Sequence, residues 1–285
     1  THYLGFNANM LANEMFLDSS QLRSSVVSHA KTLGYTTRSA TASNAVVDIF
    51  LNTTNASATM PAGTVLNATV DDVSYQFVTI AEVTAFNTGT TIAFDDIKIY
   101  EGSYVASRYV VDTQNVEQRF LINDDRADTT TLSVVVQNSA SDTIQTTYTQ
   151  ATDIAALTST SNIYFLQEVE SGQYEIYFGD GILGSAIQDG NIVIIEYVVT
   201  NKAAANGAST FTSSSAIDTV NSVNVVTVSN AAGGSEPESI ESIKYNAPLD
   251  YASQGRCVTT EDYKTYVKQL FANTQAVSVW GGEDG

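Results

Sequence analysis

The stretch Ala231-Ala232-Gly233-Gly234-Ser235-Glu236-Pro237-Glu238-Ser239-Ile240 marks the point where the composition of this 285-residue chain changes. A long region with β-strand patterning ends there, and its two adjacent glycines predict a hinge. Ser235 lies three residues before Glu238, with a proline between them, which is the pattern of a capping box at a helix start. We therefore expect a helix over about 236–246.

A second helix start follows this one. Ala247-Pro248 should close the first helix, because a residue before proline avoids the α region. Thr259 is a good N-cap for a helix over about 260–272, and the acidic Glu261 and Asp262 suit the positive end of its dipole. With a strand expected over Ala276–Trp280, residues 233–285 are predicted to form a small α/β unit that is truncated in this sequence.

The order of these segments carries a family resemblance. The stretch Arg256-Cys257-Val258-Thr259-Thr260-Glu261-Asp262-Tyr263 follows a Gly-Gly pair and an acidic helix ending in Ala-Pro. This order resembles the baseplate J-like family, the wedge proteins in the baseplates of contractile-tailed phages. The resemblance implies candidate interface or motif residues, which are Ala247, Pro248, Arg256, Val258, Thr259, Asp262, Tyr263 and Trp280.

A glycine-rich turn is a second feature shared with that family. Phe178-Gly179-Asp180-Gly181 comes directly after a predicted strand. It lacks the Lys-Ser/Thr of a phosphate-binding loop, and no helix pattern follows it. Glycine at positive φ, with the aspartate bonded to its own backbone, explains the spacing better. The candidate hinge and turn residues are Gly179, Asp180, Gly181, Gly233 and Gly234.

The composition limits the possible partners. The formal net charge is −19, from 31 acidic and 12 basic residues, while apolar residues make up 43 % of the chain. A uniformly acidic chain repels phosphate, so neither nucleic acid nor an anionic membrane is an expected partner. The single cysteine, Cys257, excludes an internal disulfide and fits assembly in a reducing cytoplasm. The sequence contains no stretch of eighteen apolar residues, so it predicts no membrane span.

The remaining chain predicts a β-dominated α+β fold with two antiparallel, sandwich-like or barrel-like modules. Residues 1–39 should hold one helix at about 19–33, capped by Asp18-Ser19-Ser20 and followed by Gly34. Polar turns separate short strands throughout residues 40–116 and 117–232, the two predicted β domains. The strands expected in the first are Val46–Leu51, Thr64–Val70, Tyr75–Ile80, Thr91–Phe94 and Ile97–Tyr100. Those expected in the second are Arg119–Ile122, Thr131–Val136, Thr143–Thr149, Ile163–Glu168, Tyr174–Phe178, Asn191–Val199 and Ser222–Val228, with a helical turn at Asp153–Leu157.

Residues that could carry out catalysis are few. The two histidines, His2 and His29, have no neighbouring ligand at metal-binding spacing, and no nucleophile elbow is present. The paired aspartates lack the Asp-x-Asn-x-Asp-Gly spacing of a calcium loop. They are Asp71-Asp72, Asp95-Asp96 and Asp124-Asp125. We predict no catalytic, metal or cofactor-binding residue.

The resemblance implies a structural subunit of the virion tail baseplate, assembled in the host cytoplasm. Expected partners are a second copy of the chain, as dimers within a ring, and other baseplate wedge, sheath-initiator and hub-proximal proteins. The ring would surround the central hub and rearrange when the tail contracts. Two alternatives from other classes are an extracellular β-rich adhesin or carbohydrate-binding module, which the acidic Ser/Thr/Asn-rich composition also fits, and a polysaccharide-degrading enzyme. Because the family implies sequence on both sides, we expect the chain to be a piece of a larger subunit.

Overall fold

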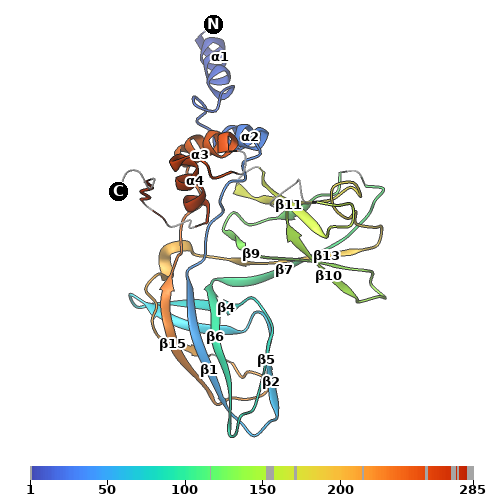
Figure 1. Cartoon of the computed structure of the whole chain (residues 1–285), viewed down its shortest axis with the longest axis vertical. Coiled ribbons are helices and arrows are strands. Elements are labelled where there is room, and N and C mark those ends of the chain that lie inside the picture. The colour runs from blue at the N-terminus through green and yellow to red at the C-terminus, as the bar shows by residue number, and fades with distance from the viewer. Residues whose placement is uncertain are drawn as a thin grey trace. The chain divides into compact units, whose positions relative to one another are not determined.

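A computed structural model of the chain divides it into two compact units. The helical unit comprises residues 1–38, 166–175 and 237–285, and the β unit comprises residues 39–165 and 176–236. Each is described by itself below (Figure 1). The residues that the structure describes are 2–115, 117–151, 157–169, 172–213, 215–253, 256–270, 274 and 276–280.

The helical unit contains four α-helices and the tip of a β-hairpin. The helices are α1 (His2–Glu14), α2 (Arg23–Thr32), α3 (Ile240–Ser253) and α4 (Thr260–Leu270). The apolar faces of α2 and α3 meet in a small core made of Val26, Val27, Ala30, Tyr35, Ile243 and Ala247. Because these residues come from both ends of the sequence, the helical unit forms only when the two ends of the chain meet.

The first two helices differ from the sequence-based expectation. α1 was not predicted, because its apolar residues are spaced irregularly and none of its described side chains is buried. The predicted cap at Asp18-Ser19-Ser20 is wrong: α2 begins at Arg23 after Leu22, which makes no side-chain capping bond. The Ser20 hydroxyl instead donates to the Phe16 carbonyl at 2.6 Å. Gly34 follows α2 at φ 81°, as predicted.

The start and end of α3 are also corrected. Ser235 does not pair with Glu238 in a capping box, because its backbone bonds to Thr41 in a short antiparallel bridge. The helix starts five residues later, at Ile240. Pro248 does not end it, since it lies inside the helix, which continues to Ser253. A proline removes one backbone hydrogen bond, and here the buried residues of α3 hold the helix together across that gap.

The β unit contains a six-stranded sheet in the order β14-β3-β4-β6-β1-β15 (Figure 1). The two outer strands of the sheet approach each other. The Gly207 amide, just before β14, donates to the Ala231 carbonyl of β15, and the Ala231 amide donates to the Ala208 carbonyl. Its strands are β1 (Asn44–Asn52), β3 (Val65–Val70), β4 (Val73–Thr79), β6 (Thr91–Glu101), β14 (Phe211–Ser213) and β15 (Val223–Ala232). A separate ribbon pairs β2 (Ser57–Met60) with β5 (Val83–Phe86), two strands that were not predicted.

Alternation of apolar and polar residues explains this sheet. Along β1, every second side chain is fully buried, from Ala45 through Val47 and Ile49 to Leu51. They join one apolar cluster that also includes Phe77 of β4. A strand buried on one face in this way has its register fixed, because a slip of one residue would expose every buried side chain.

A seven-stranded sheet has the order β7-β13-β9-β10-β11-β12-β8. Most neighbours are antiparallel, but β10 and β11 pair in parallel at Thr149 and Ile163. Its two outer strands approach each other: the Tyr109 hydroxyl of β7 donates to the Leu121 carbonyl of β8 at 2.7 Å. The strands are β7 (Ser103–Val110), β8 (Phe120–Ile122), β9 (Ala127–Gln137), β10 (Gln145–Gln150), β11 (Ile163–Glu168), β12 (Tyr174–Phe178) and β13 (Ile192–Val199).

The observed strand pairing differs from the grouping of strands that was predicted from the sequence. β7 lies before residue 116 but belongs to the seven-stranded sheet, whereas β14 and β15 return to the six-stranded sheet. Asn44 at one end of β1 is opposite Ala232 of β15. The seven-stranded sheet is therefore inserted between β6 and the 3₁₀-helix η3 (Lys202–Ala205) of the other module. Local patterns cannot show such long-range pairing.

The β-dominated α+β class itself is confirmed, with 42 % of the chain in strands and 18 % in helices. The strand predicted at Ala276–Trp280 is wrong, because these described residues form no strand. The predicted helical turn at Asp153–Leu157 lies, except for its last residue, outside the described residues. Whether the four predicted segments are separate domains stays a prediction.

Candidate functional site

The helical unit contains a buried group of polar side chains, which we call the polar clamp. Its centre is Glu238, located just before α3, whose side chain is fully buried. The carboxylate accepts bonds from Tyr35 at 2.9 and 3.0 Å, from the Arg38 amide at 3.2 Å and from Ser242 at 2.7 Å. Asn246 donates a further bond at 3.0 Å. A buried carboxylate with so many donors fixes the start of α3 against the chain before β1.

A second buried carboxylate completes the polar clamp. Glu168 of the hairpin tip forms a two-point ion pair with Arg23 of α2, at 2.6 Å through Nε and 2.9 Å through a terminal nitrogen. The Thr37 hydroxyl donates to Glu168, and the Tyr174 hydroxyl donates to the Thr37 carbonyl at 3.1 Å. Arg23 also donates to the Glu238 carbonyl, so it joins the two carboxylate-containing segments.

The electrostatics of the polar clamp follow from its burial. Burial raises the pKa of Tyr35, and the neighbouring charge of Glu238 raises it further. Burial, with the charge of Glu168, raises the pKa of Tyr174 in the same way. Burial alone would lower the pKa of Arg23, but its hydrogen bond to Glu168 and the nearby charges of Glu168 and Glu238 together raise it. At physiological pH, Tyr35 and Tyr174 are therefore neutral and Arg23 is charged. The polar clamp is a structural network rather than an acid–base site.

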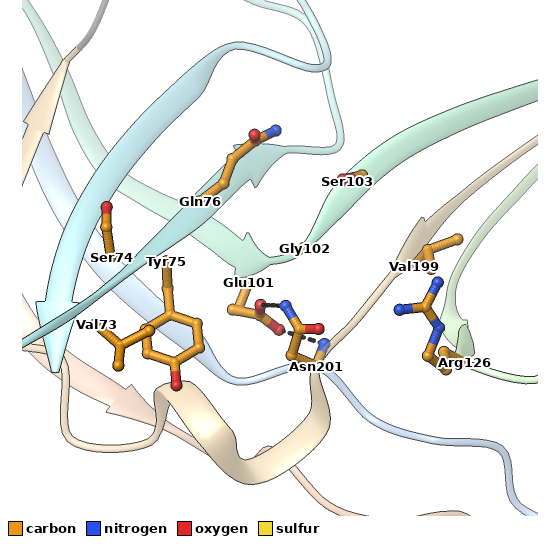
Figure 2. Close-up of a pocket in the computed structure, with 10 residues that line it drawn as sticks. All are labelled: Val73, Ser74, Tyr75, Gln76, Glu101, Gly102, Ser103, Arg126, Val199 and Asn201. Carbon is orange, nitrogen blue, oxygen red and sulfur yellow. Dashed lines mark hydrogen bonds between the residues drawn. The ribbon is translucent and has the colours of Figure 1, made fainter. Parts of the chain in front are cut away.

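A shallow cavity of about 480 Å³ lies inside the β unit, where β6 passes into β7. Figure 2 shows Glu101 beside Asn201 at its base. The buried Glu101 carboxylate accepts bonds from Thr200 at 2.7 Å and from the amide and side chain of Asn201 at 2.9 and 2.7 Å. Arg126 at the rim is paired with Asp124 at 3.2 Å. The charged groups that line the cavity are therefore already occupied by partners within the chain.

The predicted glycine turn is present with the expected geometry. Gly181 has φ 86°, and the Asp180 carboxylate accepts bonds from the amides of Ile182 and Leu183 at 2.9 and 3.0 Å. Those amide bonds lower the pKa of Asp180. A Cβ on Gly179 would lie 2.4 Å from the carbonyl carbon of Gly184, so the close approach of two backbone segments requires glycine there.

The glycine pair at 233 and 234 is tightly packed. Gly233 has φ 90°, and Asn206 bonds to both the amide and the carbonyl of Gly234 at 3.0 Å. A Cβ on Gly234 would lie 2.2 Å from the Lys202 carbonyl oxygen. Close packing therefore explains why residue 234 is a glycine, whether or not the pair moves. That the pair is a hinge stays a prediction.

The motif residues near the C-terminus lie in different settings. The hydroxyl of Thr259 accepts from the Asp262 amide at 3.2 Å, while Asp262 accepts from the amides of Thr259 and Val258 at 2.8 and 3.0 Å. This reciprocal pair caps α4 and confirms Thr259 as its N-cap. Ala247 is fully buried in the helical unit, next to Pro248. Side chains exposed at the surface are Arg256, Val258, Tyr263 and Trp280.

Sequence analysis missed the polar clamp and the surface of α1. The partners of Arg23 lie 145 and 215 residues away in the chain, so no local pattern connects them. The sequence carries little signal for α1, because its apolar residues are spaced irregularly and are separated by asparagines and a glycine, which are poor helix formers. Several of its apolar side chains, and two just beyond it, are exposed, namely Tyr3, Met10, Leu11, Met15 and Phe16.

Some functions find no support in the parts of the chain that the structure describes. No group of three or more acidic, histidine or cysteine side chains there could hold a metal ion. Among those residues, no helix is long and apolar enough to cross a membrane.

Two comparisons with known proteins identify relatives. Residues 108–209 match a family model described as the third domain of the bacteriophage baseplate wedge protein gp6. These residues include most of the seven-stranded sheet. The chain is also 30 % identical over 313 aligned residues, covering 98 % of the chain, to the baseplate wedge protein gp6 of Enterobacteria phage T4. The chain spans about half the length of that relative, since it covers 46 % of it.

Proposed function

Because the chain belongs to the baseplate wedge proteins of contractile-tailed phages, we propose that it associates with a second copy of itself and with other baseplate proteins. The family is structural, so the chain is a non-enzymatic component of the virion, located in the tail baseplate. This family membership favours the first interpretation made from the sequence over an adhesin, a carbohydrate-binding module or a polysaccharide-degrading enzyme.

The exposed apolar surface of α1 is the observation that supports association best. Leu11, Met15 and Phe16 are 70 %, 68 % and 66 % exposed, and Tyr3 is 77 % exposed. Large apolar side chains gathered on one short segment mark an interaction site more often than isolated ones do. Covering them on assembly would remove apolar surface from water, which is the main driving force of stable association.

The turn after α1 holds that helix in a defined direction relative to α2. The Glu14 carboxylate accepts bonds from the amides of Gln21 and Leu22 at 2.9 and 3.4 Å, close to the start of α2. The His29 ring lies 2.9 Å from the Glu14 carbonyl. The Ser19 hydroxyl donates to the Asn13 carbonyl at 2.6 Å. A helix presented on a hydrogen-bonded turn loses less conformational entropy when it docks.

By analogy with the family, the proposed assembly is a ring of dimers around the central hub. Wedge, sheath-initiator and hub-proximal proteins would be the further partners, and the ring would rearrange when the tail contracts. The surface residues Arg256, Val258, Tyr263 and Trp280 are proposed as additional contacts, since they are exposed and belong to the family-like segment. The Gly233-Gly234 pair is proposed as the site of movement.

The test compares two double variants of the purified full chain. Leu11→Ser with Met15→Ser removes apolar surface from α1 and from the turn directly after it, and Val226→Ser with Val228→Ser removes comparable exposed side chains from β15. We expect light scattering to show a lower mass for the α1 variant alone, with unchanged circular dichroism. If both variants keep the mass of the parent chain and both enter baseplates in infected cells, association through α1 is excluded.

A further inference from the structure

The turn at residues 179–184, which we call the apolar tip, is unusually well fixed for a surface loop. The Gly181 amide donates to the Gly184 carbonyl at 3.0 Å, closing the turn. The Gly184 amide donates to the Thr158 carbonyl at 3.0 Å, and Gly179 forms a bridge with Ala186. A Cβ on Gly184 would lie 2.6 Å from the Cδ1 atom of Ile163, so the turn sits directly on β11. Its backbone is therefore held in place from several sides.

This fixed turn presents apolar side chains to water. Ile182 is 75 % exposed and Leu183 is 44 % exposed, although their amides are both bonded inside the turn. Turns in soluble proteins favour Gly, Asn, Asp, Ser and Pro, so two large aliphatic residues at the tip are not explained by turn formation. A turn with a fixed backbone and exposed aliphatic side chains is suited to act as an anchor that fills a pocket on a partner.

Asp180 indicates the charge of that partner. Both amide bonds reach its Oδ1 atom, and the residue is exposed to water. The same amide bonds lower its pKa, so the side chain is an anion at neutral pH. An exposed carboxylate is suited to accept a bond from a cation next to the apolar tip.

We propose that the apolar tip docks into an apolar pocket, edged by a lysine or arginine, on a different protein. A second copy of this chain is a poorer source of the cation needed at this contact, because its 12 basic residues are outnumbered by 31 acidic ones. A protein with a basic rim around an apolar pocket matches both features of the turn. The apolar tip belongs to the β unit and α1 belongs to the helical unit, so this docking is a separate contact from the one tested above.

The experiment places a photoreactive amino acid at Ile182 in the phage that encodes the chain. Purified virions are irradiated, and crosslinked peptides are identified by mass spectrometry. The result expected is a crosslink to a different virion protein, at apolar residues next to a lysine or arginine. Crosslinks to a second copy of the chain, or none beyond those of the free chain irradiated in solution, would overturn the proposal. Whether the chain is present in isolated tail baseplates is read from the same samples and judges the proposed function separately.

A matched pair of substitutions separates docking from folding of the turn. Asp180→Asn keeps the Oδ1 acceptor for both amides but removes the charge, so it should leave the melting temperature unchanged and lower the crosslink yield by about threefold. Leu183→Ser removes one aliphatic side chain and should lower the yield by about tenfold. If both variants retain the parent yield, the tip is not an anchor. If Asp180→Asn unfolds the seven-stranded sheet, the aspartate acts in the turn alone and the predicted cationic partner is wrong.

Discussion

In the six-stranded sheet, the side chains with no exposed surface are apolar except for Glu101 at the end of β6, and they include Ile49, Leu51 and Ile99. In the helical unit, two carboxylates are as deeply buried as its apolar residues, because Glu168 and Glu238 have 1 % and 0 % of their side chains exposed. Apolar packing is non-directional, so a changed side chain loses stability in proportion to the contacts removed. A buried charge depends on particular donors, so the removal of one partner leaves it uncompensated. Stability should therefore decline gradually with side-chain size in one region and abruptly in the other.

The largest effect is expected from Arg23→Met in the polar clamp. Glu168 would be left in a buried position without its ion-pair partner, which costs about 3–5 kcal/mol. The free energy of unfolding, from urea denaturation followed by circular dichroism, measures this loss. The matched control is Arg126→Met, which removes an arginine from an exposed pair with Asp124 and should cost less than about 1 kcal/mol. Equal losses of unfolding free energy in the two variants would contradict the view that burial makes the polar clamp sensitive to the loss of a partner.

A graded response is expected in the six-stranded sheet. Ile99 is fully buried in its apolar cluster. Ile99→Ala should lower the free energy of unfolding by about 2–5 kcal/mol, and Ile99→Val by about 0.5–1.5 kcal/mol, because the larger deletion leaves the larger cavity. The same urea series tests both. If the valine variant lost as much stability as the alanine variant, the loss of stability would not scale with the volume of the cavity left in the cluster.

The same contrast explains what could be predicted from the sequence. The strands around Val46–Leu51 and Tyr75–Ile80 were placed correctly, because both segments are rich in β-branched and aromatic residues and burial alternates along the first. The cap of α4 was also found, since Thr259 and Asp262 are three residues apart. These features are local or periodic, and local rules are sufficient for them.

The errors arose where distant residues decide the structure. Glu238 was interpreted as the partner of Ser235, but its donors Tyr35 and Arg38 lie about 200 residues earlier in the chain. β15 was grouped with the seven-stranded sheet, although it pairs with β1. The apolar tip was recognised as a glycine turn, while the exposure of Ile182 required coordinates. A local pattern carries no information about which of several distant partners is chosen.

The junction at Gly234 should respond in an intermediate way. Gly234→Ala would place a methyl group 2.2 Å from the Lys202 carbonyl oxygen, so one of two backbone segments must move. Overpacking of this kind costs about 1–3 kcal/mol. Urea denaturation measures the loss, and hydrogen exchange should show faster exchange at Asn206, whose side chain bonds to Gly234. An unchanged free energy of unfolding would show that the junction can relax without cost.

The smallest effect is expected at the start of α4, where a polar contact is local and exposed. Thr259→Ala removes the hydroxyl that accepts from the Asp262 amide, which costs about 1 kcal/mol. Thr259→Ser keeps a hydroxyl in the same position and should retain the parent stability. Because the carboxylate of Asp262 still accepts from two amides, the helix should fray only in its first turn, as faster hydrogen exchange near Tyr263 would show. If the alanine variant lost as much stability as Arg23→Met, burial would have to be rejected as the cause of the large effect in the polar clamp.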